Sequence, residues 1–147
     1  MSIRLSTGLR NKVLESGLKP ALDGGFINIY PGSQPASPDT GATGTLLGTV
    51  SIQGLGATGL TLQVPAVLGV ISKTAAEVWS FLGLTTGQAG WFRYFEAGDT
   101  PSANSTTAAR LDGTIGTAGA DIDIGNSNIA EGSSNTMDKF AVTLPAA

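Results

Sequence analysis

The chain has 147 residues, a net charge of −3 and a charged fraction of 13%, about half of the fraction usual in globular proteins. It contains no cysteine and no histidine, which excludes disulfide bonds, thiolate chemistry and a Ser-His-Asp site. The acidic balance argues against a general nucleic-acid binder, and no apolar run is long enough for a membrane-spanning helix. We expect one domain with no cofactor, no metal, and neither nucleic acid nor membrane as a partner.

The charge is distributed unevenly, and this divides the chain into two expected parts. Residues 1–19 hold four basic side chains and one acidic side chain, a net charge of +3, whereas the other residues have a net charge of −6. We predict a basic N-terminal arm with a short helix over residues 1–24, and a β-sandwich body over residues 25–147. The N-terminal stretch lacks the long apolar core of a signal peptide, so we expect synthesis and assembly in a cytoplasm.

The arm contains the best helix candidate, residues 6–18, which Ser6 or Thr7 can cap and which Gly17 and Pro20 end. Four apolar side chains fall near one face of this helix: Leu9, Val13, Leu14 and Leu18. An isolated helix of this length is marginal in water, so it needs a docking surface on its own body or on another subunit. We expect the arm to dock through six residues: Arg4, Leu5, Leu9, Arg10, Lys12 and Val13.

Runs of β-branched and aromatic residues, separated by glycine and proline, dominate the rest of the chain. They predict strands over residues 26–30, 45–52, 60–64, 66–71, 90–95, 108–115, 120–124 and 139–144. Residues 72–82 fit either a helix or a strand, and the polar stretches 31–44 and 97–107 predict long surface loops. About eight short strands at this spacing predict an all-β protein, folded as an antiparallel β-sandwich or a jelly-roll-like barrel.

Residues 90–95 form the predicted central strand, because they hold four of the nine aromatic residues of the chain. Trp91 and Arg93 should point to one side of the sheet. Phe92 and Tyr94 should point to the other side. Large side chains on both faces indicate that other parts of the chain cover both faces of this strand.

Two arginines lie in predicted strands and need acidic partners where they are buried. These are Arg93 and Arg110. Asp112 or Glu96 can serve as the partner, which would make a structural ion pair inside the sheet.

Two motifs resemble binding sites but are better explained as structure. Residues 54–59 match the glycine pattern of a dinucleotide-binding loop, but a strand follows them where that site needs a helix, so we interpret them as a turn. Residues 121–126 faintly resemble a calcium loop, yet isoleucines alternate with Asp121 and Asp123 as in a half-buried strand. These two acids remain candidates for binding a cation between subunits.

Paired carboxylates are the remaining option for acid–base chemistry in a chain without histidine or cysteine. The candidate pairs are Glu96 with Asp99, and Asp121 with Asp123. Both pairs lie in contexts typical of a solvated loop or strand face, and no constellation with defined catalytic roles is present. We therefore expect no enzyme. An enzyme would need a cleft with at least one strongly perturbed carboxylate pKa.

Aromatic side chains offer one further alternative, a platform for a sugar or a partner. It would use Trp79, Trp91 and Tyr94, and it requires these rings to be exposed. Aromatic residues in strands more often belong to the core.

Five stretches, spread over most of the chain, combine turn glycines and strand aromatics in a familiar way. They are residues 5–11 (LSTGLRN), 25–35 (GFINIYPGSQP), 43–47 (TGTLL), 89–93 (AGWFR) and 109–113 (ARLDG). In these stretches the chain resembles small structural proteins of tailed bacteriophages. The shared motifs mark no active site, so the resemblance carries over no functional residues.

The resemblance implies a non-enzymatic building block of the virion, on the capsid surface, that acts as a decoration or cement protein. It implies a small β-rich subunit, often a homotrimer, whose partners are the major capsid protein and other copies of the chain. The expected role of the basic arm is to clamp a groove on the shell or on a neighbouring copy. A neck, tail or fibre component is the first alternative, and a carbohydrate-binding adhesion module is the second.

Overall fold

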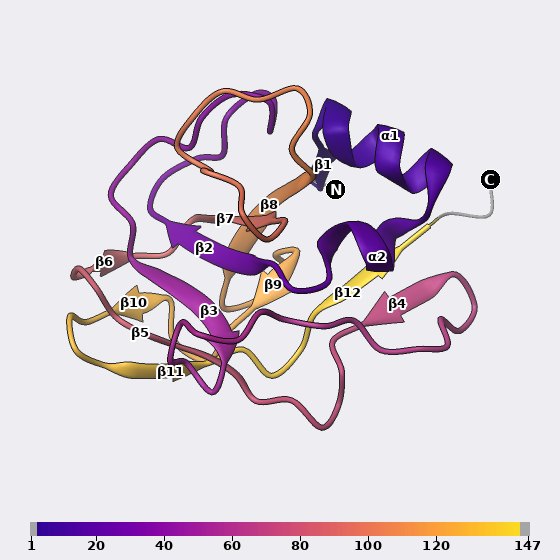
Figure 1. The fold of residues 1–147 in the computed structure, drawn as a ribbon. Helices are drawn as coiled ribbons and strands as arrows, with labels where there is room; N and C mark the ends of the chain where they lie inside the picture. The colour runs from indigo at the N-terminus through magenta and orange to yellow at the C-terminus, as the bar shows by residue number, and fades with distance from the viewer. Residues whose placement is uncertain (1–2, 145–147) are drawn as a thin grey trace.

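The computed structural model describes residues 3–144 and shows an all-β fold with two short helices near its N-terminus (Figure 1). The helices are α1 (Thr7–Glu15) and α2 (Leu18–Leu22). The strands are short and number twelve in the described part: β1 (Arg4–Leu5), β2 (Phe26–Tyr30), β3 (Gly48–Ile52), β4 (Val70–Ser72), β5 (Trp79–Leu82), β6 (Gly87–Gln88), β7 (Trp91–Phe95), β8 (Arg110–Gly116), β9 (Ile122–Asp123), β10 (Asn128–Ile129), β11 (Ser134–Thr136) and β12 (Ala141–Thr143). The prediction of an all-β, sandwich-like fold with a short N-terminal helix is confirmed.

One large sheet contains most of the strands. Its order is β1-β8-β7-β2-β3-β5-β11 with antiparallel neighbours, and β9 joins β8 as a parallel strand. The strand predicted at residues 90–95 is β7, which lies between β2 and β8 and is therefore central, as expected. Two small antiparallel pairs, β4 with β12 and β6 with β10, lie outside this sheet.

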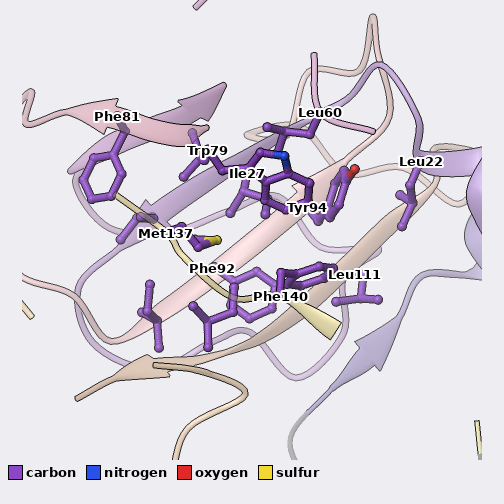
Figure 2. Packing of buried hydrophobic residues seen from close by; sticks show 14 of the residues in the cluster. Leu22, Ile27, Leu60, Trp79, Phe81, Phe92, Tyr94, Leu111, Met137 and Phe140 are labelled. Atoms are coloured by element: carbon purple, nitrogen blue, oxygen red, sulfur yellow. The ribbon is translucent and has the colours of Figure 1, made fainter. Parts of the chain in front are cut away.

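The first face of the large sheet carries the hydrophobic core, which we call the apolar face (Figure 2). Phe92 and Tyr94 belong to it on β7, and Phe140 covers them from the segment before β12. The Phe140 ring centroid lies 5.7 Å from that of Tyr94 and 6.1 Å from that of Phe92. Val142 of β12 is buried in the same cluster and Ile71 of β4 packs against it, so the β4–β12 pair forms the second layer of the sandwich.

The opposite face, which we call the polar face, also carries large side chains. Trp91 and Arg93 are buried on this side, as predicted, and the Trp91 ring stacks on Tyr30 at a centroid distance of 4.6 Å. The two long loops, residues 31–47 and 96–109, run side by side in Figure 1 and cover this face. The loops predicted to lie at the surface therefore also cover buried side chains of their own chain.

Several predicted strands are shorter than expected or absent. In residues 60–64 the predicted alternation holds for the buried Leu60 and Leu62, but Val64 is exposed, and the segment makes only isolated bridges. The prediction of a strand over 66–71 is wrong in its first part, because the chain turns back at 68–69 before β4 begins. Residues 72–82 contain the strand β5 in their C-terminal part. The unpredicted strands β1, β6, β10 and β11 have two or three residues each, too few to show a periodicity.

The predicted helix is confirmed, with a correction to its buried face. Ser6 caps α1, because its Oγ accepts a hydrogen bond from Leu9 N at 3.0 Å. Leu9 is fully buried and Val13 packs against the core, but Leu14 is 86% exposed. The helix presents positions 8, 9, 12 and 13 to the body, and position 14 is rotated away from this face.

Candidate interaction surfaces

The N-terminal segment is built into the body of the chain. Its strand β1 pairs with the edge of β8. The Ser6 hydroxyl, besides capping α1, donates to Ala108 O at 2.8 Å and accepts from Arg110 N at 2.9 Å. Gly8 approaches the loop so closely that a Cβ atom there would lie 2.2 Å from the carbonyl oxygen of Thr107. The segment thus docks on its own chain, which was one of the two possibilities that the sequence left open.

The apolar residues predicted to dock the arm are used inside the chain. Leu9 has no exposed surface, and Leu5 and Val13 are half-buried against the core. Because Leu9 belongs to the core of its own subunit, it is not available to a partner. The prediction that Leu9 docks the arm on a partner is therefore wrong.

The basic residues of the arm differ in their accessibility. Lys12 forms an ion pair with Glu96, which joins α1 to the loop after β7. Arg4 is exposed, and its Nη1 donates to Pro35 O at 2.7 Å. Arg10 is also exposed and points to solvent beside Thr7. The exposed residues of the predicted interface are therefore Arg4 on β1 and Arg10 on α1, and the exposed Leu14 lies one helical turn after Arg10.

Asp39 connects the loop 31–47 to the first turn of α1. Its carboxylate accepts hydrogen bonds from Thr7 N at 2.7 Å and from Thr7 Oγ1 at 2.6 Å. Burial opposes ionisation of this group, but the hydrogen bonds from Thr7 and the charge of Arg10 outweigh it and lower the pKa of Asp39. The sequence analysis missed this contact, because the two residues are 32 positions apart.

Arg93 holds both long loops on the polar face. Its guanidinium forms a bidentate ion pair with Asp112, with Nε–Oδ1 and Nη2–Oδ2 distances of 2.7 and 2.8 Å. Its Nη1 donates to the carbonyl oxygens of Thr40 and Pro101, one in each loop. Both charged side chains are fully buried. The predicted ion pair inside the sheet is confirmed, with Asp112 as the partner.

Arg110 does the same from β8. It forms a bidentate pair with Asp99, at 2.7 and 2.9 Å, and it donates to the carbonyl oxygens of Pro38 and Thr100. The sequence analysis considered Asp112 and Glu96 as its partners and missed Asp99. The loop after β7 folds back over β8, and this return places Asp99 beside Arg110.

The buried charges therefore have structural roles. Burial raises the pKa of Asp112, although the pair with Arg93 favours the ionised form. The side chains of Arg93, Arg110 and Asp112 have no exposed surface, so a substrate has no access to them. What these groups can do chemically is to satisfy loop carbonyls and fix the two loops relative to the sheet.

Both members of the first carboxylate pair considered for acid–base chemistry bind basic side chains of their own chain. Glu96 binds Lys12 and accepts a hydrogen bond from Ala109 N at 2.9 Å. Asp99 binds Arg110. Each carboxylate of the pair is thus committed to a different basic side chain.

The second pair, Asp121 and Asp123, belongs to a turn and a short strand. Asp121 accepts hydrogen bonds from the amide and hydroxyl of Thr114, and Asp123 accepts one from Ala120 N. The isoleucine between them is buried, which confirms the predicted alternation. Both acids line an open hollow of about 550 Å³. Within residues 3–144 no three metal-ligating side chains gather at one place.

The remaining motifs also have structural explanations. The glycine pattern at residues 54–59 is a turn after β3, as interpreted, and the bridge at Leu60 follows it instead of a helix. Trp79, Trp91 and Tyr94 are all buried, with at most 1% of each side chain exposed. The exposed aromatic platform that sugar binding requires is therefore not formed, and the proposal of a glycan site on these rings is wrong.

The accessible surface contains a long uncharged stretch that the sequence analysis did not single out. No charged residue occurs from Thr40 to Ser72. Large hydrophobic side chains in this stretch are exposed at four positions: Leu55, Val64, Val67 and Leu68. The signal in the sequence was the missing charge, but the predicted strand at residues 66–71 suggested that these side chains were partly buried.

Comparisons with known proteins do not assign the chain to a family. No protein-family model matches it, and neither the curated proteins nor the solved structures include a match. The helices in residues 3–144 are too short and too polar to cross a membrane.

Proposed function

We propose that this chain is a non-enzymatic structural protein of a bacteriophage virion, which binds the capsid surface and stabilises it as a decoration or cement protein. The partners would be the major capsid protein and other copies of the chain, with a homotrimer as the expected assembly. The resemblance of five stretches to small phage structural proteins first suggests this function. The way the chain uses its charged residues supports it.

The observation that carries the proposal is that the chain pairs several of its charged side chains internally and leaves one long stretch of its surface without charge. Arg93, Arg110 and Asp112 are fully buried, and Lys12 is paired with Glu96. The stretch from Thr40 to Ser72 brings no charge to the surface. Uncharged surface costs less free energy to desolvate than charged surface. Such a surface suits a protein that is packed against neighbouring subunits.

The stabilising effect would arise by mass action. A protein that binds only the assembled shell shifts the equilibrium towards that state, by about 2.7 kcal/mol per site at a free concentration of about 100 times Kd. The accessible side chains of the N-terminal segment, Arg10 and Leu14, are the contact that we assign to the shell. A cationic group beside an apolar one fits a groove that is both acidic and apolar.

Co-sedimentation with empty, expanded phage shells tests this function. The wild-type chain should bind saturably and raise the temperature at which the shells fall apart. The Kd of the double variant Arg10→Glu/Leu14→Glu should be higher by a factor of about ten or more, because a repulsive charge replaces each contact. Lys139→Glu reverses an exposed charge outside the arm and is the matched control. Deletion of residues 1–19 is unsuitable, because it removes Leu9 from the core.

A wild-type chain that remains in the supernatant at saturating shell concentrations would overturn the decoration function. The same experiment with isolated tails then addresses the neck, tail or fibre alternative. Equal loss of binding in the Arg10→Glu/Leu14→Glu and Lys139→Glu variants would show that the arm is not the contact.

A further inference from the structure

A short hairpin projects the most exposed leucine of the described chain into solvent. Val67 and Val70 face each other and exchange two backbone hydrogen bonds, of 2.9 and 3.0 Å, so only Leu68 and Gly69 form the turn. Both turn residues have positive φ, 52° and 77°. This geometry normally selects asparagine followed by glycine, and a leucine in the first position is disfavoured.

Leu68 does not contribute to the folding of its own subunit. It is 96% exposed, so it adds nothing to the core, and its backbone conformation is unfavourable for a branched side chain. Asparagine or glycine would close the same turn with less strain. The fold of the subunit therefore gives no physical reason for a leucine at this position.

Neighbouring side chains extend the apolar character of the tip. We call this set the hairpin face: Val64, Pro65, Val67, Leu68 and Leu144. Leu144 is held beside the turn, because its amide donates to Gly69 O at 2.9 Å. On the flank of the hairpin lies a hollow of about 130 Å³, lined by Gln63, Pro65, Val67, Val70 and Ser72.

The absence of charge favours a second copy of the chain as the partner. Two identical surfaces that meet around a symmetry axis place like charges next to each other, and the chain as a whole has a net charge of −3. The hairpin face and the hollow contain no charged side chain, so two copies can meet there without repulsion. A neutral face gives no electrostatic attraction to nucleic acid or to anionic lipid. An uncharged apolar tip beside an uncharged hollow therefore allows the same face of two copies to meet.

We propose that the hairpin face is the contact between copies of this chain, with Leu68 of each copy seated against the hairpin of its neighbour around a symmetry axis. This deepens the self-association part of the proposed function and does not depend on binding to a shell. Burial of the tip in this contact would remove the exposed apolar surface and account for a leucine at a turn position that disfavours it.

The first test compares the variants Leu68→Asn and Leu55→Asn by sedimentation equilibrium of the full-length chain over a concentration series, without shells. Leu68→Asn should weaken self-association about tenfold or more, because a leucine side chain is no longer buried at each contact. It should unfold at the same or a higher temperature than wild type, because asparagine suits a positive φ. Leu55→Asn removes another exposed leucine, at the turn after β3, and should associate like wild type.

The second test uses the absence of cysteine in the natural chain to measure proximity. The single substitution Ala66→Cys places a thiol on the hairpin face, and Ala57→Cys places one in the turn after β3; both positions are exposed. Under mild oxidation, Ala66→Cys should form a disulfide-linked pair of subunits much faster than Ala57→Cys. The mass of the assembly then gives the number of copies around the axis.

Three results would overturn the inference: a wild-type chain that is monomeric at all concentrations, equal weakening by the two leucine variants, or equal cross-linking at positions 66 and 57. Flotation of the monomer with phosphatidylcholine vesicles, lost in Leu68→Asn, would assign the hairpin face to a lipid surface instead. A chain that self-associates through Leu68 but ignores shells supports this inference and overturns the decoration function. A chain that binds shells but is monomeric at all concentrations overturns this inference and supports the decoration function.

Discussion

The two faces of the large sheet are both buried, but different forces hold them. On the apolar face, Phe140 and its neighbours exclude water from aromatic and aliphatic side chains, and many weak contacts share the stabilisation. On the polar face, Arg93 and Arg110 are buried beneath two loops, and a small number of directional hydrogen bonds does the same task. One strand, β7, contributes to both faces through alternate residues.

The comparison shows what each kind of burial can tolerate. Among dispersed apolar contacts, a change in the shape of one side chain lowers the free energy of unfolding only gradually. Removal of one partner of a buried ion pair lowers it sharply, because an unpaired charge is left in a medium of low dielectric constant. The polar face should therefore be more sensitive to small substitutions, although its ion pairs contribute little net stability. What they determine is where the two loops lie.

The largest expected effect comes from removing one buried charge on the polar face, compared with removing one buried methylene on the apolar face. Asp112→Asn leaves the guanidinium of Arg93 without its counter-charge and should lower the free energy of unfolding by about 3–5 kcal/mol. Ile29→Val, on the apolar face of β2, should lower it by only about 0.5–1.5 kcal/mol. Urea unfolding monitored by tryptophan fluorescence measures both values. Equal losses would show that the two faces do not differ in tolerance.

An intermediate effect is expected where the two loops touch each other on the polar face. A Cβ atom at Gly41 would lie 2.2 Å from the carbonyl oxygen of Ser102, so Gly41→Ala must push the loops apart and should cost about 1–3 kcal/mol. Gly125→Ala is the control, since nothing lies within 4 Å of its Cβ position, and its effect should stay within about 0.5 kcal/mol. Thermal unfolding of the two variants at one pH provides the measurement. A neutral Gly41→Ala variant would mean that the loops are not clamped tightly.

The smallest expected effect concerns Asp39, which links the polar face to α1. Its pKa in the folded chain is below the ordinary value of 3.8, so its stabilisation is complete above that pH and is lost as the pH falls through the lower folded value. Asp39→Asn should cost about 0.3–1 kcal/mol at neutral pH, because the charge at the helix N-terminus is removed. The difference from wild type should vanish in acid.

Urea midpoints of wild type and Asp39→Asn, measured from pH 7 down to acid, give this difference as a function of pH. Asp138→Asn removes an exposed carboxylate elsewhere and corrects for the change in net charge. A difference between wild type and Asp39→Asn that remains constant down to low pH would contradict a stabilising role of the ionised carboxylate.

Local patterns predicted the elements that follow from alternation. Residues 90–95 revealed the central strand and the two directions of its side chains, and Ser6, the observed helix cap, was one of the two predicted candidates. These features depend on neighbours within a few residues, which the sequence shows directly. Leu14 was wrongly predicted to be buried, because a hydrophobic pattern does not say how wide a face of the helix the body covers.

Contacts between distant residues could not be predicted in the same way. The need of Arg110 for an acid was evident, but Asp99 became its partner only through the return of the loop after β7. The protruding Leu68 looked like part of a strand, because an apolar run gives the same signal in a strand and in an exposed hairpin. Its exposure depends on where the chain turns.

The sequence by itself determined the all-β class, the central strand and the requirement for buried counter-charges. Alternation has a period of two in any strand, and a buried guanidinium needs a carboxylate in any fold. The tertiary structure decided which carboxylate serves each arginine, that the N-terminal segment packs on its own chain, and that Leu68 faces solvent. These outcomes depend on how the loops close, because loop closure brings together residues that no local pattern connects.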